Sequence, residues 1–158
     1  MSYRKEKFLK FKKSELISKV NYLDEISSDE ISNLFHEVLN GAIHGFCYSL
    51  YEEGQKPGDK ISREQINHRI KILSEHSGWV RSFSCTDGNE LIPEVAKEHG
   101  LKTMVGAWLG KDQEKNEAEI ENLIRIAKKG VVDIATVGNE VLYRNDLSKE
   151  ELIKYINQ

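Results

Sequence analysis

The chain has 158 residues, of which 39% are hydrophobic and 31% charged, so a packed core is feasible and disorder is not expected. Its formal net charge of −3 gives no reason to expect nucleic acid or an anionic membrane as a partner. No segment approaches the ~20 apolar residues of a membrane span and no apolar stretch follows the basic N-terminus, so we expect a cytoplasmic protein.

Two helices are predicted before the first strand, and together they form an N-terminal extension over residues 1–40. The first covers residues 14–23, where Leu16, Ile17 and Val20 recur at helical spacing. The second covers residues 28–39, after a Ser27/Glu30 capping-box pair, and it ends at Asn40-Gly41.

Four strand-then-helix units follow over residues 41–158, at intervals of roughly 25 to 35 residues, which is the size of a βαβ module. The strands are predicted at residues 42–50, 79–85, 103–109 and 132–137. The helices are predicted from Ser62, over 89–99, in the stretch that closes at Gly130, and from Ser148. The strands are nearly continuous apolar runs, which indicates that both of their faces are buried.

Such a string of units builds either an open doubly wound sheet or a closed eight-stranded barrel. The loop after the first strand has no G-x-G-x-x-G pattern, so nothing indicates a dinucleotide site. A barrel needs ~250 residues, so this chain has room for half of one.

The two cysteines, Cys47 and Cys85, lie in strand-like segments and lack the spacing of metal ligands. Two small buried thiols are the simplest interpretation. A disulfide between them would require neighbouring strands and export of the protein. We expect neither a metal nor a cofactor.

In βα proteins the functional side chains lie where strands end, at the carboxyl edge of the sheet. The fourth strand ends at Asn139-Glu140, and apolar residues flank this glutamate on both sides. The pattern predicts a partly buried Glu140, and burial disfavours the ionised form, as suits a general acid. The alternative is a structural glutamate paired with a strand-end arginine such as Arg81, and the pattern alone leaves both open.

The segment Val137-Gly138-Asn139-Glu140-Val141 resembles the acid/base motif of glycoside hydrolase family 17, the β-1,3-glucanases and related glucosyltransferases. Gly45–Ser49 resembles the first strand of that family and Val80–Ser84 resembles its second. Ile92–Ala96 and Leu101–Gly106 resemble the next helix and strand. The ordered similarity covers residues 42 to 156.

The resemblance implies a retaining mechanism on a (β/α)8 barrel, with β-glucan or an oligosaccharide as substrate and no cofactor. Glu140 would be the acid/base residue, and Asn139 would bind the 2-hydroxyl of the sugar. Tyr48 would line the same subsite, and Arg81 would orient Glu140 or an adjacent loop. Trp108 is either a sugar platform or a core aromatic.

Two departures from the family pattern matter. Phe83 stands where the family usually has tyrosine, and the nucleophile that the family carries on its seventh strand has no counterpart in the sequence. Retaining hydrolysis needs that second carboxylate about 5–5.5 Å from the first. We therefore expect little or no turnover by this chain alone. The alternatives are a truncated enzyme, a half-barrel that assembles with itself or a second half through open edges, and a non-catalytic β-glucan-binding remnant.

Overall fold

The computed structural model describes residues 26–40 and 43–158, and the chain divides into two compact units, Met1–Gly41 and Ala42–Gln158. In the first unit, helix α3 spans Ser28–Asn40. It begins at the predicted capping box, in which Ser27 N donates to Glu30 Oε2 (2.9 Å) and Glu30 N donates to Ser27 Oγ (3.3 Å). The helix predicted at residues 14–23 lies outside the described residues.

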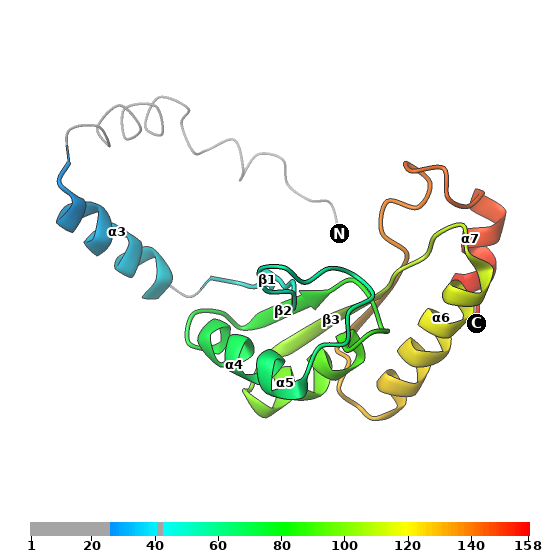
Figure 1. Cartoon of the computed structure of the whole chain (residues 1–158), viewed down its shortest axis with the longest axis horizontal. Coiled ribbons are helices and arrows are strands. Elements are labelled where there is room, and N and C mark those ends of the chain that lie inside the picture. The colour runs from blue at the N-terminus through cyan, green and yellow to red at the C-terminus, as the bar shows by residue number, and fades with distance from the viewer. Residues whose placement is uncertain (1–25, 41–42) are drawn as a thin grey trace, which may run out of the picture. The chain divides into compact units, whose positions relative to one another are not determined.

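The second unit is an α/β domain with four parallel strands in the order β1-β2-β3-β4 (Figure 1). A helix follows each strand along the chain, and each of β2, β3 and β4 pairs with the strand that precedes it in the sequence. This arrangement confirms the predicted succession of strand-helix units. Its elements in chain order are β1 (Phe46–Cys47), α4 (Arg63–Ser74), β2 (Trp79–Ser82), the 3-10 helix η1 (Asn89–Leu91), α5 (Ile92–Glu98), β3 (Lys102–Ala107), α6 (Gln113–Lys128), β4 (Ile134–Val137) and α7 (Lys149–Ile156).

The helix starts follow the local capping chemistry. The Ser62 side chain accepts from Gln65 N at the start of α4, and Ser148 with Glu151 forms a complete capping box at α7, as predicted. The single helix predicted over 89–99 is divided instead. Its first turn is the 3-10 helix η1, and α5 begins at Ile92 with Pro93 in its first turn, where a missing N–H is tolerated.

Helices α4, α5 and α6 pack on one face of the sheet and enclose two adjoining clusters of buried apolar side chains. The first cluster joins β2 to α4 and α5 through Val80, Ile66 and Val95. The second joins β3 to α6 through Val105, Ile120 and Ile126. Burial of these side chains is the main contribution to stability on this face.

The opposite face of the sheet carries an apolar groove of about 210 Å3, lined by His44, Gly45, Phe46, Cys47, Trp79, Val80, Arg81, Met104 and Ile134. All of these residues belong to the strands or to the segment just before β1, and none of the described helices contributes to the lining. The prediction that both strand faces are buried is therefore wrong for one face of the part that the structure describes, where Ile134 is 39% exposed.

The cysteines differ from each other. Cys85 is buried as predicted, whereas Cys47 is exposed because it lies on the groove face of the sheet, and neither forms a disulfide. Burial, and secondarily the neighbouring Glu119 charge, raises the pKa of the Cys85 thiol, so that thiol stays protonated. Within the described ranges, none of the helices is both long enough and apolar enough to cross a membrane.

Candidate active site

The candidate acid/base residue lies in a tight turn that follows β4. Gly138 N donates to Ala107 O (2.9 Å), which continues the pairing with β3 for one residue beyond the strand. Gly138 (φ +77°) and Glu140 (φ +53°) both take left-handed conformations. A Cβ at position 138 would lie 2.5 Å from Val141 Cγ2, so the turn requires glycine there. A left-handed glutamate is uncommon, and such backbone outliers are typical of functional sites.

The Glu140 side chain is exposed and forms no ion pair with any described residue. The predicted partial burial is therefore wrong for this structure. The apolar neighbours in the sequence do not surround the carboxylate, because Val141 alone turns into the core while Leu142 (48% exposed) and Tyr143 (85%) face outward. The alternative, a structural ion pair with Arg81, does not form either.

Arg81 binds Asn139 rather than Glu140. From β2, its Nη2 donates to Asn139 Oδ1 (3.1 Å), and its guanidinium lies over the Phe83 ring, 4.5 Å from the centroid. A guanidinium can only donate, so it fixes which way the Asn139 amide points. Asn139 Nδ2 donates no hydrogen bond to any described residue, so it can donate to a ligand.

Trp108 lies at the carboxyl end of β3 and is 43% exposed, which rules out the core-aromatic alternative for this side chain. Its backbone N donates to Glu119 Oε2 (3.1 Å). The Arg144 guanidinium covers one face of the indole, with Cζ 4.4 Å from the ring centroid. The exposed area therefore belongs to the opposite face and the ring edge, where a flat apolar surface suits a pyranose.

The structure does not bring Tyr48 together with Asn139 or Glu140. Cys47 pairs with Arg81 on the groove face, so Tyr48, one residue later, points to the helix side. There it is 6% exposed within the first apolar cluster, with Arg69 of α4 above its ring at 6.0 Å. Burial raises the pKa of Tyr48 to about 12, and its hydroxyl has no partner among the described residues.

Sequence reasoning missed Glu119, a carboxylate of α6 that is only 4% exposed. It accepts hydrogen bonds from the hydroxyls of Ser84 and Thr86 and from the backbone N of Cys85 (2.6 Å) and Trp108 (3.1 Å). Glu119 thus joins the carboxyl ends of β2 and β3. The one signal in the sequence is its place on the apolar face of α6, four residues before Leu123.

Sequence reasoning also missed Arg144, which lies in the loop between β4 and α7. Its side chain donates to Asn139 O, to Leu109 O (2.9 Å) and to Asp146 Oδ2 (2.7 Å). These contacts join the loops that follow β3 and β4. No pattern in the sequence singles this arginine out.

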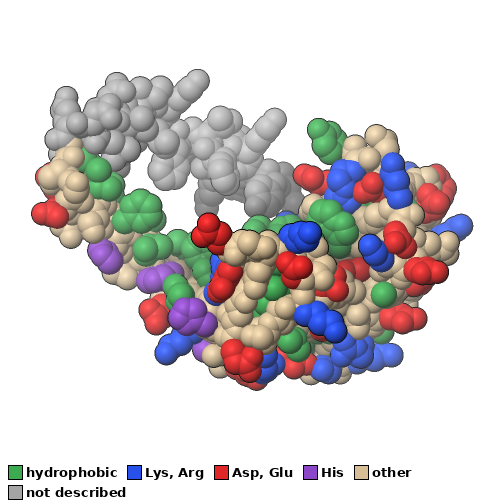
Figure 2. All heavy atoms as spheres, viewed as in Figure 1, with side chains coloured by type: hydrophobic (Ala, Val, Ile, Leu, Met, Phe, Trp, Pro, Cys, Tyr) green, Lys and Arg blue, Asp and Glu red, His purple; other side chains and the backbone are tan. Residues whose placement is uncertain are grey.

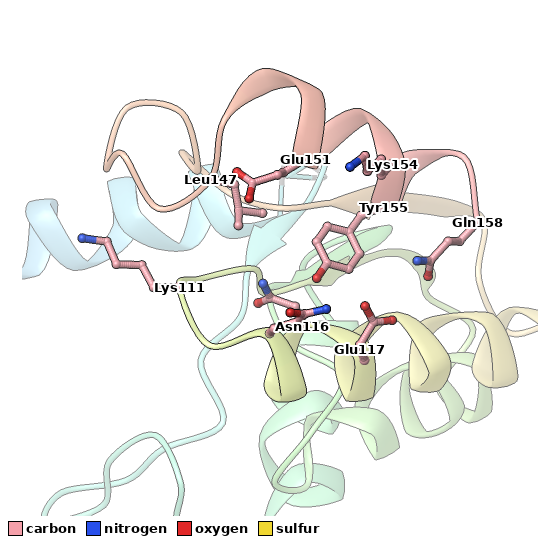
Figure 3. Close-up of a pocket in the computed structure, with 9 residues that line it drawn as sticks. Lys111, Asn116, Glu117, Leu147, Glu151, Lys154, Tyr155 and Gln158 are labelled. Atoms are coloured by element: carbon pink, nitrogen blue, oxygen red, sulfur yellow. The ribbon is translucent and has the colours of Figure 1, made fainter.

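A separate pocket of about 300 Å3 opens between α6 and α7 (Figure 3). The hydroxyl of Tyr155 points from α7 toward Asn116 and Glu117 of α6. None of the predicted site residues lines this pocket, which is bordered by Lys111, Gln113, Asn116, Glu117, Leu147, Glu151, Lys154, Tyr155 and Gln158. Residues 26–40 and 43–158 contain no group of three or more His, Cys, Asp or Glu side chains that could hold a metal ion.

The BtgE/BtgC glycoside hydrolase domain family matches residues 45–158 of the chain. A glucan 1,3-beta-glucosidase of Arthroderma benhamiae is 32% identical over 111 residues, covering 66% of this chain and 36% of the relative. One of Schizosaccharomyces pombe is 27% identical over 143 residues, covering 85% and 42%. One of Candida albicans is 28% identical over 93 residues, covering 56% and 30%.

These matches confirm the resemblance to β-1,3-glucan-active glycoside hydrolases that the motifs indicated. The aligned part of this chain spans less than half the length of each of these relatives. No solved structure matches the chain.

Proposed function

Since this chain belongs to the BtgE/BtgC glycoside hydrolase domain family, we propose that it carries the acid/base side of a retaining active site for β-1,3-glucan. The four strand-helix units would then be the first half of a (β/α)8 barrel. The names of the relatives, glucan 1,3-beta-glucosidases, support this substrate class. The interspersed acidic and basic side chains on the face of the second unit in Figure 2 suit an uncharged ligand.

The observation that carries the proposal is the meeting of three neighbouring strand ends. Arg81 of β2 orients Asn139 at the end of β4, and Trp108 lies at the end of β3 between them in the sheet order. The carboxyl edge of a parallel sheet is where βα enzymes place their functional groups. Asn139 Nδ2 would donate to the sugar 2-hydroxyl, and the open face of Trp108 would support the ring.

Glu140 would supply both proton transfers. As a carboxylic acid it would donate its proton to the glycosidic oxygen while the bond from that oxygen to C1 breaks and the nucleophilic carboxylate forms a bond to C1. As a carboxylate it would then take a proton from the water or sugar hydroxyl that attacks C1 of the glycosyl-enzyme, while the bond from C1 to the nucleophile breaks. The exposed Glu140 of this structure would gain the desolvation that a general acid needs when bound glucan covers it.

The nucleophile would come from outside residues 43–158, as the resemblance to family 17 implies. A retaining site holds its two carboxyl groups about 5–5.5 Å apart, so catalysis requires an element that closes over the edge of the sheet next to Glu140. The relatives extend beyond the matched region, which leaves room for that element in proteins of this family.

Calorimetric titration with laminarihexaose tests this function. We expect the 158-residue chain to bind laminarihexaose in preference to cellohexaose and to release no reducing sugar from laminarin. Asn139→Ala should weaken binding about tenfold or more, because a site hydrogen bond to the sugar is lost. Glu140→Gln should bind as the wild type does. Equal binding by wild type and Asn139→Ala, or no binding by either, would refute the proposed site.

A self-associating half-barrel is the second candidate, and the groove of β1–β4 favours it. Exposed apolar surface on an uncovered sheet face stabilises association when a second copy covers it. This candidate predicts that the apparent mass rises with concentration. A non-catalytic glucan-binding protein would instead remain monomeric and bind laminarihexaose.

A further inference from the structure

Arg144 holds the backbone on both sides of Glu140. Its side chain donates to Asn139 O, which belongs to the peptide group before the Glu140 Cα. Its backbone N donates to Glu140 O (2.9 Å), which belongs to the peptide group after that Cα. The two peptide planes determine the direction of the Cα–Cβ bond, so a single residue sets where the Glu140 side chain leaves the turn.

The same guanidinium holds the aromatic side chain at the neighbouring strand end. It lies over the Trp108 ring, with Cζ 4.4 Å from the ring centroid, and its Nη2 donates to Leu109 O (2.9 Å) in the segment just after β3. Its Nε donates to Asp146 Oδ2 (2.7 Å), which fixes the plane of the group. All three nitrogens of the guanidinium are therefore engaged while its face covers the indole.

We propose that Arg144 is a positioning residue that fixes the acid/base carboxylate of Glu140 relative to the Trp108 platform. This inference rests on the function proposed for those two residues. The requirement is geometric, because a glycosidic oxygen must meet the carboxyl group while the adjoining sugar ring lies on the indole. A displacement of about 1 Å between such groups costs orders of magnitude in effectiveness.

The contact pattern separates this role from a contribution to the core. Arg144 donates to two loop carbonyls and one carboxylate, all at the carboxyl ends of β3 and β4, and it stacks on a side chain that is itself 43% exposed. Only a planar fork satisfies all of these groups at once. Lysine keeps the charge but offers one ammonium group, so it cannot reproduce the arrangement.

The test uses the whole chain with Trp79→Phe as the background. Trp79 and Trp108 are the only two tryptophans in the sequence, so all tryptophan fluorescence in this background comes from Trp108. Arg144→Met and Arg144→Lys are compared with Arg125→Met, an exposed α6 arginine whose side chain, among the described residues, donates to Asn122 of its own helix alone. The readouts are acrylamide quenching of Trp108, amide exchange of residues 138–147, laminarihexaose affinity and melting temperature.

We expect both Arg144 variants to expose Trp108 to acrylamide, to speed exchange in the turn and to lower laminarihexaose affinity about tenfold or more. Lysine should recover the melting temperature of the wild type without recovering the other three readouts. Arg125→Met should change none of them. Unchanged quenching and exchange in both Arg144 variants would overturn the positioning role, whatever their affinities.

Two further outcomes keep the inference separate from the proposed function. If the wild type fails to bind laminarihexaose while the Arg144 variants still loosen Trp108 and the turn, the proposed function fails and the structural coupling stands. If Arg144→Met does not fold, Asp146→Ala replaces it, because alanine removes the acceptor of Nε and leaves the arginine in place. Asp146→Ala should then increase acrylamide quenching of Trp108 and lower laminarihexaose affinity, each by less than Arg144→Lys does, and wild-type values for both would overturn the inference.

Discussion

At the scale of single residues, the turn after β4 depends on backbone conformations that few side chains adopt. Gly138 and Glu140 both have positive φ within three residues, and Val141 directly after them is 3% exposed in the second apolar cluster. The buried valine holds one end of the turn against the core, and Arg144 holds the other. Because contacts with the core and with Arg144 fix this turn, the backbone from which the exposed Glu140 side chain extends is held in place.

Gly138→Ala tests the steric part of that arrangement. The new methyl group would lie 2.5 Å from Val141 Cγ2 and would also force a left-handed alanine. Gly130→Ala is the matched control, because Gly130 has nearly the same φ (+75°) but open space around its Cα. We expect about 1 kcal/mol of destabilisation for Gly130→Ala and about 2 kcal/mol more for Gly138→Ala in urea unfolding. Equal losses would show that Val141 does not restrict the turn.

Tyr48 predicts how stability depends on pH in the alkaline range. Burial raises the pKa of Tyr48 to about 12, against about 10 for an unfolded tyrosine. Between these values the unfolded state loses the proton and the folded state keeps it, so this contribution is fully present below pH 10 and is lost as pH rises toward 12. Tyr48→Phe should flatten that fall and leave laminarihexaose affinity unchanged. A loss of affinity would place Tyr48 in the sugar site after all.

At the scale of elements, the helix starts were predictable because their causes are local. Ser27, Ser62 and Ser148 each accept a hydrogen bond from an amide three residues away, and the sequence shows both partners together. Glu119 and Arg144 were not predictable in the same way. Their partners at Cys85 and Leu109 lie 34 and 35 residues away, so the contacts exist only after the strands have been assembled.

The Glu140 environment was mispredicted for a related reason. Apolar neighbours in a sequence indicate burial only where the chain stays extended or helical, and here the strand ends at Val137 and the chain turns. Leu142 and Tyr143 then point outward, so they cannot cover the carboxylate. By contrast, the succession of apolar runs correctly predicted four strands, and in a parallel sheet their carboxyl ends lie at one edge.

Glu119→Ala tests how far α6 holds the ends of β2 and β3 in place. The change removes the acceptor of the buried backbone N–H of Cys85, at about 1–3 kcal/mol, and that of the partly buried N–H of Trp108, at a smaller cost. Glu119→Gln should cost less, because its amide oxygen can serve the two N–H groups while its NH2 donates to the hydroxyls of Ser84 and Thr86. Glu121→Ala, an exposed change on the same helix, is the control in urea unfolding. Equal losses for Ala at 119 and 121 would contradict the role of Glu119.

At the scale of the whole chain, the helix-covered face and the groove face of the sheet are unequal. Two apolar clusters stabilise the first, whereas the second carries Phe46, Trp79, Met104 and Ile134 around a groove that no described helix lines. A sheet with one face buried in an apolar core can fold, but an apolar opposite face that is open to solvent favours association. The groove is therefore the surface of the second unit through which the proposed self-association would occur.

Ile134→Lys tests that conclusion by placing a charge in the groove. Ile134 is 39% exposed and lines the groove, whereas Ile72 is 54% exposed on α4, away from the groove lining. In sedimentation velocity over a range of concentrations, we expect the wild type and Ile72→Lys to associate, and Ile134→Lys to remain monomeric because a buried lysine charge costs several kcal/mol. The circular dichroism of all three should agree, since position 134 faces away from the two clusters that hold the fold together. A wild type that stays monomeric throughout, or an Ile134→Lys variant that associates as the wild type does, would mean that the groove is not a contact surface between copies of this chain.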